Sequence, residues 1–129
     1  MIKQTFFIEG YWKVIVLYNI DYNLFYNIDI LLAKAGATSD LIDEIYYNMS
    51  RNKAKAVTYS NLSEHISVVL FNHHKSSKDY LNSIVHEAEH IKQAMLKVYR
   101  VEDKGEPPAY TIGYIVMRMY EVFKYFICS

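Results

Sequence analysis

One segment limits the possible folds and functions of this chain more than any other. Residues 78–99 carry apolar side chains at helical spacing: Leu81, Ile84, Val85, Ala88, Ile91, Met95 and Val98. Ser76 or Ser77 can cap the start of this segment, and the helix dipole favours Asp79 in its first turn. The pattern predicts an amphipathic helix from about Lys78 to Tyr99.

The same segment contains the sequence His86-Glu87-Ala88-Glu89-His90, which has the pattern H-E-x-x-H. Residues four apart share a helix face, so the two imidazoles can bind one Zn²⁺ while Glu87 acts as a general base. His86 and His90 lie nearly opposite the centre of the apolar stripe and are not expected in the core. The alternative is a solvated helix face that holds two histidines by chance.

A catalytic zinc site needs three protein ligands and an open position. Downstream of the motif the candidates for the third ligand are Glu102, Asp103, Glu106 and Glu121. Glu106 opens the next helix and is the preferred candidate, although the connection from Val98 to Lys104 must curl back to bring it to the metal. Its alternative role is that of a helix N-terminal carboxylate, which the helix dipole stabilises.

The composition indicates one domain, residues 1–129, with a sizeable core, because 52% of the residues are hydrophobic. A formal net charge of +0 argues against nucleic-acid binding by bulk electrostatics. Residues 114–128 are interrupted by Arg118, Glu121 and Lys124, which is typical of a core helix and not of a membrane span. A single cysteine, Cys128, and an N-terminus without a secretory signal indicate a cytoplasmic protein.

The remaining segments predict an α+β fold. Strands are expected at 5–8 and 11–18, joined by a turn at Glu9-Gly10, and at 56–60 and 65–71. Helices are expected from Asp21 to Gly36, from Thr38 to about Arg51, and after Pro108. We therefore expect a small, mostly antiparallel sheet with helices on one side, in which the metal-motif helix and the C-terminal helix close the site.

Several short motifs also resemble a known group of proteins. The order of Trp12-Lys13-Val14, Thr58-Tyr59-Ser60-Asn61, the H-E-x-x-H motif, Gly105-Glu106 and Tyr110-Thr111-Ile112-Gly113 is similar to that of small zincin-like proteins of gut Bacteroidales and their phages or mobile elements. The likeness covers nearly the whole chain. Such proteins often have Gly-Glu-Glu where this chain has Gly105-Glu106-Pro107, so a second carboxylate is missing here.

The resemblance implies a zincin-like fold and a metallopeptidase of the gluzincin type, with Glu106 as the third zinc ligand. It also implies that residues 65–71 form an edge strand that holds the substrate backbone. Glu87 is then the catalytic base, and Tyr110 or His74 is a candidate to stabilise the oxyanion. A short peptide or an exposed protein segment is the expected substrate. The competing hypothesis is a zincin-like interaction module without turnover, and the sequence leaves the oligomeric state open.

Overall fold

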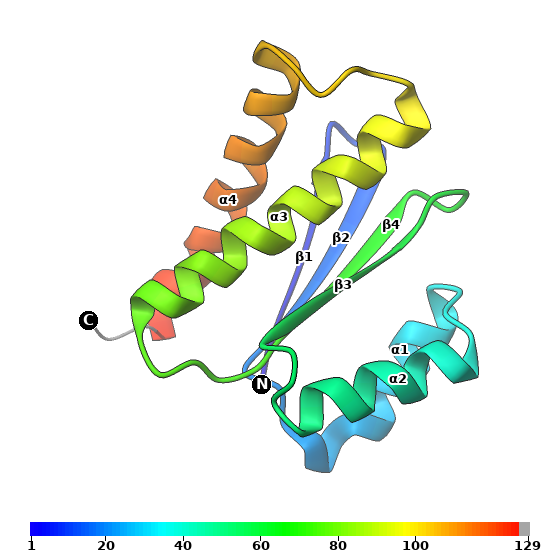
Figure 1. Ribbon diagram of the computed structural model, residues 1–129, viewed down its shortest axis with the longest axis vertical. Helices are drawn as coiled ribbons and strands as arrows, with labels where there is room; N and C mark the ends of the chain where they lie inside the picture. The colour runs from blue at the N-terminus through cyan, green and yellow to red at the C-terminus, as the bar shows by residue number, and fades with distance from the viewer. Residues whose placement is uncertain (127–129) are drawn as a thin grey trace.

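A computed structural model describes residues 1–126 of the chain and shows an α+β fold (Figure 1). Cys128 lies outside the described residues. In chain order the elements are β1 (Ile2–Ile8), β2 (Trp12–Tyr18), a 3₁₀ turn (Tyr22–Leu24), α1 (Phe25–Lys34), α2 (Ser39–Ser50), β3 (Ala56–Asn61), β4 (Ile66–Phe71), α3 (Ser77–Tyr99) and α4 (Glu106–Phe126). None of the helices within residues 1–126 has the length and apolar character needed to cross a membrane.

The sheet consists of two antiparallel hairpins joined along its centre. Its strand order is β1-β2-β4-β3, and the central pair, β2 and β4, is parallel. The prediction of a mostly antiparallel sheet is confirmed, because β1 pairs with β2 and β3 with β4 in antiparallel register. The sheet is nevertheless mixed, since the chain between β2 and β4 crosses over through α1, α2 and β3.

Strand β4 lies inside the sheet, so the expectation that residues 65–71 form the edge strand beside the metal-motif helix is wrong. Val68, Val69, Leu70 and Phe71 are each at most 1% exposed. A continuous apolar run of this kind is typical of a strand that is covered on both faces. The edge strand on this side of the sheet is β3, whose residues are all of intermediate exposure.

Helices cover both faces of the sheet, which corrects the expectation that they lie on one side (Figure 1). Val14, Val16 and Tyr18 of β2 belong to the core beneath α3 and α4. Ile15 and Leu17 belong to a second core beneath α1 and α2. Successive strand residues point to opposite faces, so the unbroken apolar run in β2 requires cover on both sides.

Local signals set the length of α3, the helix that carries the metal motif. The Ser76 side chain accepts a hydrogen bond of 3.1 Å from the Asp79 backbone N–H and so caps the first turn. At the other end Arg100 adopts a left-handed conformation with φ of 56°, which terminates the helix. The prediction of a helix from Lys78 to Tyr99 is therefore confirmed to within one residue.

Candidate metal centre on helix α3

The two histidines of the motif lie side by side on the exposed face of α3. Their Nε2 atoms are 3.2 Å apart, and their ring centroids are separated by 4.8 Å. Two nitrogen ligands at about 2.0–2.1 Å from a tetrahedral Zn²⁺ are roughly 3.3 Å from each other. The spacing of His86 and His90 therefore fits two ligands of one zinc ion without a change of backbone or helix register.

Glu87 turns away from the histidines and enters the interface between α3 and β3. Its residue is 4% exposed, and Oε1 accepts a hydrogen bond of 2.9 Å from the Thr58 hydroxyl. Burial raises the pKa of the Glu87 carboxyl, while the Thr58 hydrogen bond and the charges of His90 and His86 act in the opposite direction. A buried carboxyl group whose pKa is raised holds its proton more readily than an exposed one, which suits proton transfer.

A groove of about 320 Å³ lies between the edge strand β3 and the second half of the exposed face of α3. Thr58 and Ser60 line it from the strand, and His90 and Gln93 line it from the helix. His90 and the hydroxyl that binds Glu87 therefore face the same space. This arrangement brings an imidazole of the motif, the hydrogen-bond partner of a buried carboxyl and an edge strand together at one site.

A chain of buried polar groups leads from the core to this groove. The Trp12 indole donates a hydrogen bond of 2.9 Å to the Ser67 hydroxyl, which lies 2.6 Å from the Ser60 hydroxyl. Trp12 and Ser67 are completely buried. Trp12, Thr58 and Ser60 belong to the motifs that carry the resemblance, but no site role was expected for them or for Ser67. Thr58 and Ser60 alternate along β3 and so share one strand face.

Glu106 is not brought to the histidine pair. It is the first residue of α4 and lines a different cavity together with Met95 and Tyr99. Throughout residues 1–126 no group of three or more His, Cys, Asp or Glu side chains is close enough to hold a metal ion. The two histidines therefore provide two of the ligands that a zinc site needs. Within residues 1–126 no side chain is placed to be the third.

The other carboxylates that were candidates for the third ligand have partners of their own. Asp103 accepts a hydrogen bond of 2.6 Å from Gln93 and forms an ion pair of 3.0 Å with Lys92. Glu102 pairs with Lys104, and Glu121 pairs with Arg118. Asp103 folds the connection between α3 and α4 back onto α3, one turn beyond His90.

Neither candidate for oxyanion stabilisation lines the groove beside His90. Tyr110 is 76% exposed and lines the cavity that Glu106 also lines. His74 has both ring nitrogens engaged, Nδ1 at 2.8 Å from the Asn72 carbonyl and Nε2 at 2.7 Å from the Ser83 hydroxyl. Because a carbonyl oxygen only accepts, Nδ1 carries the proton and neutral His74 accepts the Ser83 hydrogen at Nε2.

Comparisons of the chain with protein-family models, with curated proteins and with solved structures found no match.

Proposed function

We propose that the protein is a zinc-dependent hydrolase that cleaves a peptide bond in the groove beside β3, on a zincin-like arrangement of strand and helix. The observation that carries the proposal is the 3.2 Å separation of the His86 and His90 Nε2 atoms, with buried Glu87 on the adjacent side of the helix. A bound zinc ion would supply Lewis-acid activation of water and of the scissile carbonyl.

Glu87 has the properties required of the proton carrier in this reaction. Burial favours its neutral form, so a proton taken from the attacking water is retained until the leaving amine accepts it. The Thr58 hydroxyl fixes one carboxyl oxygen and leaves Oε2 to exchange the proton. Thr58 is thus a positioning residue, because it acts on the reaction only through Glu87.

The groove also indicates the form of the substrate. An edge strand offers backbone N–H and C=O groups to an extended peptide, and β3 lies at the edge of the sheet next to the groove. A cavity of about 320 Å³ accommodates a few side chains and not a folded domain. The proposed substrate is therefore a short peptide or an exposed segment of another protein.

The decisive experiment compares zinc-loaded wild type with zinc-loaded Glu87→Gln on a broad peptide library and on candidate cellular proteins. We expect turnover to fall by about 10²- to 10⁴-fold while zinc content is retained. Glu89→Gln is the matched control, because Glu89 is the other carboxylate of the motif and forms an ion pair with Lys92 instead. Equal cleavage by wild type and Glu87→Gln would contradict the proposed mechanism.

A second function is a zinc-binding interaction module that lacks turnover. It is favoured by the absence of a third metal-binding side chain beside the histidines within residues 1–126. Both functions predict zinc on His86 and His90, so metal content does not separate them. If no peptide or protein is cleaved by wild type and spared by Glu87→Gln, the interaction module is the better explanation and the hydrolase is rejected.

A further inference from the structure

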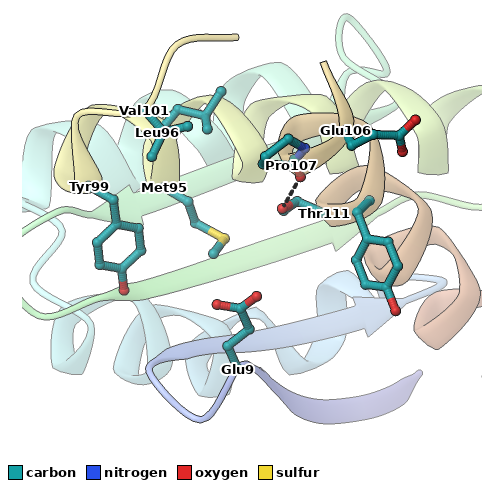
Figure 2. Close-up of a pocket in the computed structure, with 9 residues that line it drawn as sticks. Glu9, Met95, Leu96, Tyr99, Val101, Glu106, Pro107 and Thr111 are labelled. Carbon is teal, nitrogen blue, oxygen red and sulfur yellow. Dashed lines mark hydrogen bonds between the residues drawn. The ribbon is translucent and has the colours of Figure 1, made fainter. Parts of the chain in front are cut away.

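A second cavity lies on the opposite side of α3 from the groove, where the end of α3, the start of α4 and the turn between β1 and β2 meet (Figure 2). Its volume is about 500 Å³, which is within the range of small-molecule sites. The walls are mostly apolar and aromatic, and the residues that line it are Glu9, Met95, Leu96, Tyr99, Val101, Glu106, Pro107, Tyr110 and Thr111.

The charged residues that line this cavity are both acidic. Figure 2 shows the Glu9 carboxylate directed from the β1–β2 turn toward the space beside Met95, whereas the Glu106 carboxylate points outward at the rim. An adjoining hollow of about 300 Å³ shares Glu9, Tyr110 and Thr111, so Glu9 lines both spaces. Within residues 1–126 neither carboxylate belongs to an ion pair.

The helix ends around the cavity also favour positive charge in a ligand. The last turns of helix α3, at its partially negative end, line one side of the cavity. Helix α4 begins there with Glu106, Pro107 and Pro108, and a proline has no backbone N–H to donate. Two of the donors that a helix N-terminus normally offers to an anion are therefore missing, and Glu106 offsets the positive end of the dipole.

We propose that this cavity binds an organic cation, namely an ammonium group carried on an apolar, preferably aromatic, body. The Glu9 carboxylate pairs with the ammonium group. Tyr99 and Tyr110 supply aromatic rings for cation–π contact, and Met95, Leu96 and Val101 contact the apolar body. Met95, Leu96 and Tyr99 belong to the same helix as the histidine pair, but His86 and His90 do not line this cavity, so the proposal is independent of zinc.

The test uses two probes that share a phenylethyl body and carry opposite charge. 2-Phenylethylamine and 3-phenylpropanoate are titrated separately into the full-length chain, and binding is followed by NMR chemical shifts and by isothermal titration calorimetry. We expect the amine to bind at least about tenfold more tightly than the carboxylate. The two glutamates that line the site attract the amine and repel the carboxylate. Equal affinity for the two probes, or tighter binding of the carboxylate, would overturn the proposal.

Variants of two turn residues locate the site. Glu9→Gln should weaken amine binding by about three- to fivefold, the range of a solvent-accessible ion pair. Glu64→Gln is the matched control, because Glu64 is an exposed glutamate in the other hairpin turn and does not line the cavity. An unchanged affinity in Glu9→Gln would show that the amine does not bind here.

Two further measurements distinguish this proposal from neighbouring explanations. 2-Phenylethanol has a similar body without charge, so affinity equal to that of the amine would reduce the cavity to an apolar hollow and contradict the proposal. The His86→Ala, His90→Ala double variant should bind the amine as wild type does. Loss of amine binding in the double variant would contradict the proposed location, whereas loss of zinc binding there concerns only the metal centre.

Discussion

The Thr58 hydroxyl donates a 2.9 Å hydrogen bond to Oε1 of Glu87 and so connects the edge strand β3 to the metal-motif helix. Glu87 is almost completely buried, and the Thr58 hydroxyl is the hydrogen-bond donor to it within residues 1–126. Burial raises the free energy of the ionised form of this side chain and favours the neutral carboxylic acid.

The first prediction concerns stability against pH in the metal-free protein. The pKa of Glu87 is raised in the folded state, so the folded state binds its proton more tightly. This contribution to stability is fully present below the unfolded value of about 4.3 and is lost as pH rises through the higher folded-state pKa. Glu87→Gln should therefore melt at a higher temperature than wild type at pH 7, and the difference should shrink toward pH 4. Thermal unfolding of both proteins from pH 4 to 8 measures this, and a variant less stable at pH 7 would contradict the assignment.

The second prediction concerns metal content. Wild type supplied with zinc at neutral pH should hold about one ion per chain, and the His86→Ala, His90→Ala double variant should hold none at this site. Zinc at a thousandfold excess over its Kd should stabilise the wild type by about 4 kcal/mol. Elemental analysis and melting curves with and without chelator provide the measurement. Full zinc occupancy in the double variant would place the metal elsewhere.

The third prediction concerns Glu106, which the resemblance assigns to zinc and which the structure places in the opposite cavity. We expect Glu106→Gln to retain the zinc affinity of wild type, because the carboxylate does not meet the histidines. Competition with a chromogenic chelator measures the affinity, and Glu102→Gln is the matched control in the same connection. A strong loss in Glu106→Gln alone would mean that the segment 100–105 rearranges to complete the site.

The fourth prediction concerns the polar chain behind the groove. Ser67→Ala removes the acceptor of the Trp12 indole and leaves a completely buried N–H without a partner, which should cost about 1–3 kcal/mol of unfolding free energy. Ser60→Ala should cost less, because Ser60 is half-buried and water can replace it beside Ser67. Denaturant unfolding of the two variants gives the comparison, and equal costs would contradict this account.

The fifth prediction concerns His74. Burial lowers the pKa of His74 in the folded state, so its neutral form contributes stability that is fully present above the unfolded value of about 6.5. This stability is lost as pH falls through the lower folded-state pKa. His74→Gln should reduce this loss of stability between pH 7 and 5, whereas His73→Gln, at an exposed neighbour, should not. Melting temperatures across this range would refute the prediction if both variants behaved as wild type.

Local patterns identified most elements of the fold in advance. The cap at Ser76 and the apolar stripe gave α3, and Glu9-Gly10 is a turn in which both residues have positive φ. The arrangement of the elements was harder to predict, because the apolar runs identify β2 and β4 as strands but not which helices cover each face of the sheet. A continuous apolar run in a strand predicts that both faces of the sheet are covered.

The candidate site shows the same division between local and distant information. A four-residue interval on one helix fixes the separation of His86 and His90, so the sequence alone predicted that the two imidazoles lie side by side. The position of Glu106 depends on how Asp103 and Lys92 fold the connection back onto α3, and no local pattern encodes that ion pair. The partner of Glu87 on β3 likewise depends on which hairpin forms the sheet edge.

The parallel pairing of β2 with β4 has a consequence for the kinetics of folding. Each hairpin brings together residues that are close in sequence, but Lys13 meets Ile66 across 53 positions (66 − 13). Closing so long a loop is entropically costly, so we expect the two hairpins to form early and the central seam to be completed near the rate-limiting barrier. The Trp12–Ser67 hydrogen bond spans this seam, and the Glu87–Thr58 hydrogen bond forms beside it. Both therefore depend on correct docking of the two hairpins. Chains that have formed their hairpins but not their central register would then contain an intact histidine pair and no groove.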